Sequence, residues 1–226
     1  MIRAILYSLI FSTVIMSITI IINWLYPPIK YDKKLIKLGY ALSSLNIFML
    51  AFIDGMKYGN IAYLKIYTGL FDYSITWLIL SSIIYVIITD CLLWLQHYIF
   101  HTKILYKWFH YVHHKFTYPT AFDFTAIHPV DMLTIYFSYH IVALIIPVYA
   151  GTIYLYGIVG NFLGLLYHGQ GLLLFTKNKY FGKYFKNIDI EFHNIHHLIH
   201  SSNYGIGLFT TFWDKLFGTY KRSVKL

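Results

Sequence analysis

Residues 90–114 read DCLLWLQHYIFHTKILYKWFHYVHH, a stretch that joins the end of a long apolar run to a histidine-rich segment. Its histidines form an H-x3-H pair and an H-x2-HH group: His97 and His101, then His110, His113 and His114. Positions i, i+3 and i+4 lie on one face of a helix. Each group is therefore expected to direct its imidazoles towards one point.

The pattern returns nearer the C-terminus, where His193, His196 and His197 form a second H-x2-HH and His168 stands alone. Twelve histidines placed at random in this chain would give such a motif only about 0.03 times. Neutral imidazole binds iron, zinc, copper and nickel. The clustering favours metal ligands over ordinary polar loop residues. Because one tetrahedral ion takes four ligands, eight or nine such histidines predict two ions rather than one.

Other classes of metal protein fit the composition less well. The chain has a single glutamate, Glu191, so a carboxylate-bridged site in a four-helix bundle cannot be built from Glu. A zinc hydrolase is disfavoured because the H-E-x-x-H motif is absent. A transporter would hold its ligands in the middle of the membrane, whereas these histidines lie at the ends of apolar runs.

Four further residues are expected to orient ligands or to position substrate: Asp90, His128, Asn161 and His200. Asp90 precedes His97 by two helical turns, so its carboxylate is predicted to orient a ligand imidazole, with a helix-end charge as the alternative. Asn161 precedes His168 by the same interval, and a hydrogen bond between helices is its alternative. His128 begins a His-Pro pair, and His200 follows the last group by one turn.

Composition indicates a membrane protein. The chain of 226 residues is 58% hydrophobic and only 12% charged, about half the charged share of a soluble domain. Uncharged or apolar runs occupy residues 4–26, 38–53, 73–89 and 132–176. The run at residues 38–53 is short, so it either spans a membrane or lies in the interface, whereas the other three are long enough for membrane helices. Pro147 and Gly151 near the middle of the last run predict a tight turn between two antiparallel spans.

We therefore expect an all-α integral membrane protein with about four to five transmembrane or membrane-embedded helices and a cytosolic, histidine-rich di-metal cap. Residues 1–72 are predicted to be an N-terminal membrane anchor region, and residues 73–226 a catalytic domain. The net charge of +9 is spread over several interhelical segments, which favours loops on the cytoplasmic side over binding to nucleic acid.

In their order and spacing, these residues resemble the fatty acid hydroxylase superfamily, and most closely its sterol C-5 desaturase branch. The resemblance runs from Asp90 to about Tyr220. It includes the three histidine groups and four further pieces: the His128-Pro129 pair with Asp131, Asn161 to His168-Gly169, Asn203-Tyr204-Gly205, and Trp213-Asp214 through Gly218-Thr219.

The resemblance implies a membrane-bound, non-haem di-iron oxidoreductase that uses O2 to hydroxylate or desaturate a sterol-like, sphingolipid or fatty acyl or alkyl lipid. The ligands it implies for the two iron ions are His97, His101, His110, His113, His114, His168, His193, His196 and His197. Zinc is a possible replacement metal. Because the chain has no dinucleotide-binding motif, an external cytochrome or ferredoxin with its reductase is expected to supply electrons.

The sequence departs from the pattern of fatty acid 2-hydroxylases at one position. Those enzymes show a second H-x3-H where this chain has only His168, because position 164 is glycine. One metal is then expected to lack a protein ligand, with Asn161 or water in its place. The alternative to an enzyme is a non-catalytic or degenerate metal-binding membrane protein.

Overall fold

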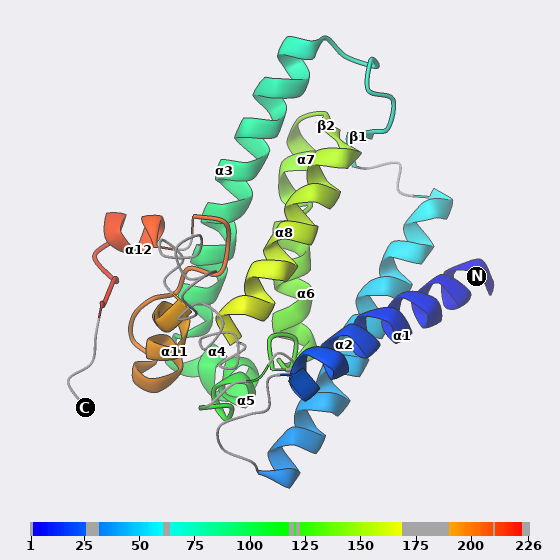
Figure 1. The fold of residues 1–226 in the computed structure, drawn as a ribbon. Coiled ribbons are helices and arrows are strands. Elements are labelled where there is room, and N and C mark those ends of the chain that lie inside the picture. Colours follow the sequence, from blue (N-terminus) through cyan, green and yellow to red (C-terminus); the bar gives the residue numbers. More distant parts are fainter. Residues whose placement is uncertain are drawn as a thin grey trace.

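The computed structural model describes residues 2–25, 32–60, 64–117, 120, 123–168, 190–209 and 211–222, and these residues are mostly helical (Figure 1). The elements are, in chain order, α1 (Ile2–Leu25), α2 (Lys33–Asn60), β1 (Ile66–Tyr67), α3 (Ile75–Phe100), α4 (Lys103–Leu105), the π-helix η1 (Tyr106–His110), α5 (Tyr111–His114), α6 (Pro129–Ser138), α7 (Ile141–Ile145), β2 (Val148–Tyr149), α8 (Ala150–His168), α11 (Ile190–Ile199) and α12 (Phe212–Leu216).

The long helix α3 is the central element. Its first turn is capped by Ser74, whose hydroxyl accepts a hydrogen bond from the Trp77 backbone N–H. One face packs into an apolar core with α7, β2 and α8, formed by Tyr85, Leu93, Val142, Ala143, Val148, Ile153 and Tyr156. The C-terminal end of α3 carries His97 and leads directly into α4, so this core fixes where the histidine-rich segment begins.

The uncharged run at residues 132–176 reverses direction as expected, close to Pro147. The chain goes out through α6 and α7 and returns through α8 (Figure 1). At the turn, β2 pairs in parallel with β1 over two residues, with Ile66 opposite Val148. The outward arm is not one continuous helix: it breaks at Tyr139, whose carbonyl accepts a hydrogen bond from the Tyr85 hydroxyl at 3.0 Å.

The N-terminal helices α1 and α2 pack along each other beside this core (Figure 1). The sequence favoured a short apolar helix over residues 38–53, but α2 is longer and begins at Lys33. Its buried Asn46 donates hydrogen bonds to the carbonyls of Thr125 and Ile127, both at 2.8 Å. The predicted anchor region is therefore bonded to the loop that precedes α6.

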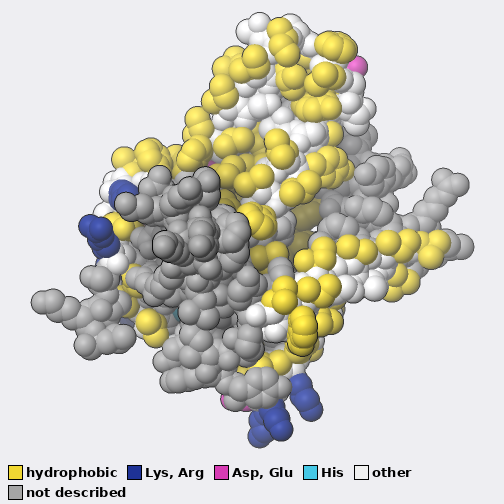
Figure 2. Space-filling view, viewed as in Figure 1, with side chains coloured by type: hydrophobic (Ala, Val, Ile, Leu, Met, Phe, Trp, Pro, Cys, Tyr) yellow, Lys and Arg dark blue, Asp and Glu magenta, His cyan; other side chains and the backbone are white. Residues whose placement is uncertain are grey.

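Two described stretches are long and apolar enough to cross a membrane, Lys33–Ile53 and Ile75–Phe100. Large apolar side chains also lie exposed along α3 and α8, for example Ile79, Ile83, Leu155 and Ile158, and Figure 2 shows such side chains over much of one face of the molecule. A soluble monomer rarely exposes so large an apolar surface. These features indicate association with a membrane.

Candidate metal centre

All nine histidines predicted as ligands lie in two compact groups at one end of the helices. The five-histidine group consists of His97, His101, His110, His114 and His196, and the four-histidine group of His113, His168, His193 and His197. Within each group, one nitrogen from every ring lies within 4.8 Å of those of the others. Each group is therefore compact enough to hold a metal ion. Eight of the nine side chains are buried, and His101 is half-buried.

Each H-x2-HH motif contributes to both groups, which the sequence interpretation did not anticipate. His110 and His114 belong to the five-histidine group, whereas His113 belongs to the other. In a helix, residues i and i+4 point about 40° apart, but consecutive residues point about 100° apart. The motif therefore cannot aim all three imidazoles at one point. The C-terminal motif is divided in the same way, with His196 in the five-histidine group.

A π-helical turn precedes the first of these motifs. In η1 the Tyr111 backbone N–H donates to the Tyr106 carbonyl, five residues earlier. Such turns are rare and often lie at functional sites. The turn ends at His110, so it sets the rotation at which this imidazole and those of α5 face α3 and α11.

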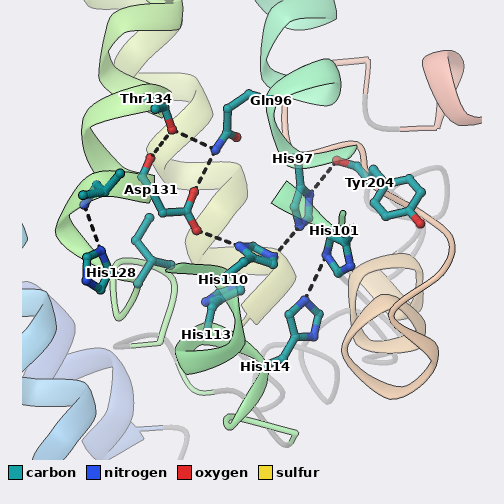
Figure 3. A network of polar contacts seen from close by, with 12 residues as sticks. Gln96, His97, His101, His110, His113, His114, His128, Asp131, Thr134 and Tyr204 are labelled. Atoms are coloured by element: carbon teal, nitrogen blue, oxygen red, sulfur yellow. Dashed lines mark hydrogen bonds and ion pairs between the residues drawn. The ribbon is translucent and has the colours of Figure 1, made fainter. Parts of the chain in front are cut away.

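The hydrogen bonds of His97 and His110 orient both rings. His97 Nδ1 donates to the Tyr204 carbonyl at 2.7 Å, and His110 Nδ1 donates to the Asp131 carboxylate at 2.6 Å (Figure 3). A ring that is neutral and donates from Nδ1 has a lone pair on Nε2. The two Nε2 atoms lie 3.1 Å apart, so with both rings neutral neither has a proton to share. Two buried lone pairs that face each other are stabilised by a cation between them.

His196 supplies a third free lone pair in the same group. Its Nδ1 donates to the Ser202 carbonyl at 2.6 Å, and its buried Nε2 has no hydrogen-bond partner. In the four-histidine group, His168 Nδ1 donates to the Gly164 carbonyl at 2.8 Å. The His168 Nε2 then faces the Nε2 of His193 at 2.9 Å. The donor set of both groups therefore fits a metal that accepts neutral imidazole.

Five of these rings are kept neutral by their surroundings. Burial, reinforced by neighbouring imidazoles, lowers the pKa of His113, His114, His193, His196 and His197 well below the usual histidine range. A neutral imidazole does not have to lose a proton before it binds a metal. Both groups are therefore ready to bind metal at neutral pH.

Asp131 is the carboxylate that orients a candidate ligand, and the sequence interpretation gave this role to Asp90. Asp131 lies in the first turn of α6, is 1% exposed, and also accepts a hydrogen bond from Gln96 Nε2 at 2.7 Å (Figure 3). A carboxylate bonded to a ligand imidazole fixes its tautomer and raises its basicity. In the sequence, Asp131 stood out only as part of the His128-Pro129 piece of the family resemblance.

Asp90 has a different set of partners. Its carboxylate accepts hydrogen bonds from the Tyr156 hydroxyl, the Phe209 backbone N–H and the Trp213 indole N–H. The expectation that it orients a ligand imidazole is therefore corrected: it ties α3 to α8 and to the C-terminal segment. Helical periodicity placed Asp90 on the correct face but could not identify the segment that packs there.

The other three expected residues lie outside both groups. Asn161 is exposed and donates to the Gly157 carbonyl of its own helix at 2.7 Å, so it does not supply the missing ligand. His128 is the N-cap of α6, where Nδ1 accepts from the Val130 N–H. His200 packs on His114 with ring centroids 4.3 Å apart, but its nitrogens bond to the His197 carbonyl and the Tyr106 hydroxyl.

The glycine at position 164 has a packing cause. A Cβ atom at this position would lie 2.1 Å from the Phe124 ring. Phe124 in turn packs against the His168 imidazole, with ring centroids 5.6 Å apart. An aromatic ring therefore occupies the space that a second histidine would need, and the four-histidine group has one member fewer.

Comparison with known proteins gives one family. The model of the family described as fatty acid hydroxylase matches residues 82–219, well over half of the chain. The chain is 32% identical over 149 residues to the Delta(7)-sterol 5(6)-desaturases of Saccharomyces cerevisiae and Candida glabrata, a match that covers 64% of this chain and 37% of each relative.

Rat lathosterol oxidase is 32% identical over 165 residues, which cover 70% of this chain and 52% of that protein. The matches therefore span about one third to one half of the length of these relatives. No solved structure gives a significant match.

Proposed function

Because the chain belongs to the fatty acid hydroxylase family, we propose that it is a membrane-bound, non-haem di-iron oxidoreductase that uses O2 to hydroxylate or desaturate a lipid. The sterol-directed names of its relatives favour a sterol-like substrate over a sphingolipid or acyl chain. The observation that carries the proposal is the pair of compact histidine groups, in each of which one nitrogen from every ring lies within 4.8 Å of those of the others.

In this proposal the nine histidines hold two iron ions, one in each group. Bound iron supplies the activation of O2 that oxidation of an unactivated C–H bond requires. The chain's own residues bind and orient: Asp131 fixes the tautomer of His110, and the Tyr204 and Ser202 carbonyls fix those of His97 and His196. Burial of the rings excludes water from the site.

The overall reaction requires a reductant. Hydroxylation inserts one oxygen atom of O2 and forms one water, while desaturation removes two hydrogens from the lipid and forms two waters. Either outcome consumes two electrons and two protons. We propose that an external cytochrome or ferredoxin with its reductase provides the electrons. Exposed lysines at residues 33, 34, 37, 103 and 107 suit an acidic partner protein.

We further propose a multi-pass membrane protein with its site on the cytoplasmic side. Three of these lysines begin α2, at the same end of the molecule as α5 and α11 (Figures 1 and 2), and positive charge favours the cytoplasmic face. Residues 1–72 act as the anchor region and residues 73–226 as the catalytic domain. The Asn46 contacts imply that the anchor also supports the loop before α6.

Metal stoichiometry tests the proposal first. The protein, purified in detergent from iron-supplemented cells, is expected to hold about two ions per chain, and His101→Ala or His193→Ala fewer, because each removes a ligand from a different group. His140→Ala is the matched control, since that ring bonds to the Tyr136 carbonyl of its own helical turn. Metal contents that do not respond to the ligand substitutions would contradict the proposed site.

Turnover separates the enzyme from a non-catalytic metal protein. The iron-loaded protein, given O2, a reductant and a Delta(7)-sterol, is expected to produce sterol that has lost two hydrogens or gained one oxygen. Mass spectrometry distinguishes these products. If lipids of all three classes remain unchanged while two ions are bound, the alternative of a degenerate metal-binding protein is favoured.

A further inference from the structure

The segment formed by residues 202–209 and 211–220, here called the C-terminal strap, contains the Asn-Tyr-Gly and Trp-Asp pieces that have no assigned chemistry. It contributes no side chain to either histidine group. Its contribution is two backbone carbonyls, those of Ser202 and Tyr204, which accept the Nδ1 protons of His196 and His97. Both rings belong to the five-histidine group.

Each of these carbonyls belongs to a peptide unit whose N–H is held from the opposite side. The Tyr204 carbonyl shares its peptide plane with the Gly205 N–H, which donates to Asp214 Oδ2 at 2.8 Å. The Ser202 carbonyl shares its plane with the Asn203 N–H, which donates to the Thr219 carbonyl at 3.0 Å. Because a trans peptide is planar with its N–H and C=O opposed, fixing one edge fixes the direction of the other.

Asp214 is built into the strap as a buried hydrogen-bond acceptor. It is 0% exposed, and it also accepts hydrogen bonds from the Tyr204 backbone N–H at 2.9 Å and from the Thr219 hydroxyl. The carboxylate therefore fixes both peptide units that flank Tyr204.

Asn203 gives the strap the bend that this arrangement needs. Its φ of 61° lies in the left-handed region, which asparagine tolerates better than most residues. The side chain is fully buried and bonds to the Phe192 carbonyl of α11 and to the backbone N–H and carbonyl of Lys221. The strap is thus tied to the helix that carries His196.

We propose that Asp214 is a positioning residue for the five-histidine group: through the peptide units it fixes, it holds His97 in the tautomer and orientation that bind metal. The proposal rests on the proposed function only in requiring this group to hold a metal ion. The four-histidine group should be insensitive to Asp214, because the Nδ1 contact of its His168 comes from Gly164 in α8. Loss of a partner that orients a ligand costs about 10–100-fold in metal affinity.

Asp214→Asn is the direct test, since its amide NH2 cannot accept a hydrogen bond from a backbone N–H. The variant is made in two backgrounds, and apo protein is titrated with Co2+ while the ligand-field absorption is recorded. In the His193→Ala background only the five-histidine group is intact, and we expect affinity to fall about 10–100-fold. In the His97→Ala background the ring that Asp214 orients is absent and the four-histidine group is intact, so we expect no change.

Two further variants distinguish the positioning role of Asp214 from a general folding defect. Thr219→Val removes only the hydroxyl that donates to Asp214 and should weaken the five-histidine group in the same direction by a smaller factor. Asp123→Asn changes another buried carboxylate, which bonds to the Thr120 N–H, and should leave Co2+ affinity unchanged in both backgrounds.

The outcomes distinguish failure of the positioning role from failure of the metal site itself. Unchanged affinity, or an equal loss in both backgrounds, would overturn the positioning role while leaving the metal site in place. If neither background binds Co2+ even with Asp214 intact, the proposed metal site itself fails, and the positioning role fails with it.

Discussion

Acidification should destabilise the apo-protein steeply, because five buried histidines are held neutral in the folded chain. Burial and the surrounding imidazoles lower the pKa of His113, His114, His193, His196 and His197 in the folded chain. In the unfolded chain each titrates near the ordinary value of about 6.5. Below that pH the unfolded state binds more protons than the folded state, so the free energy of unfolding falls as pH falls.

The size of the effect follows from the number of such groups. Between pH 7 and pH 5.5, each histidine that takes up a proton only on unfolding lowers the free energy of unfolding by about 1.3 kcal/mol. Five together give roughly 6 kcal/mol, which is comparable to the entire stability of a typical domain at about 5–15 kcal/mol. Above pH 7 these histidines are neutral in both states, and their contribution to the pH dependence disappears.

Thermal unfolding of the metal-free protein, followed by circular dichroism from pH 8 to pH 5, measures this dependence. We expect a flat melting temperature above pH 7 and a steep decline below about pH 6.5. His197→Ala should make the decline shallower, by about 1.4 kcal/mol per pH unit in the free energy of unfolding. A melting temperature that stays constant down to pH 5.5 would show that the imidazoles are not held neutral, and the reasoning would fail.

Three substitutions test other contacts. Asp131→Ala should lower metal affinity of the five-histidine group about 10–100-fold, measured by titration of apo protein; an unchanged affinity would remove its orienting role. Gly164→Ala places a Cβ 2.1 Å from the Phe124 ring and should lower the free energy of unfolding by about 1–3 kcal/mol. Adding Phe124→Leu should restore the melting temperature, and a double variant no more stable than Gly164→Ala would contradict the clash. Asn46→Leu leaves the two carbonyls before α6 without their buried donor and should destabilise by about 1–3 kcal/mol, whereas an unaltered melting temperature would contradict that contact.

The histidine groups show how far sequence spacing predicts a site. The motifs identified all nine residues that the structure brings together, and the comparisons confirm the family and its likeness to sterol desaturases. Spacing could not divide the nine into groups of five and four. That division depends on which helices face α5 and α11, and no pattern within one helix contains this information.

The residues that orient the rings were harder to predict for a second physical reason. Periodicity selects residues on the same helix face, so it favoured Asp90 and Asn161, which lie two turns from a histidine. The actual partners of His97 and His196 are backbone carbonyls of the C-terminal strap. A carbonyl is present at every residue and leaves no side-chain signal, so its role appears only when the chain is folded.

The division of the two H-x2-HH motifs also links the groups mechanically. Since α5 and α11 each carry histidines of both groups, a rotation of either helix displaces ligands in both at once. The five-histidine group has additional supports, Asp131 on α6 and the strap behind His97 and His196. The four-histidine group has one ring fewer because Phe124 fills the space beside Gly164. The two candidate metal positions therefore share a frame but differ in ligand number and in the contacts that orient their ligands.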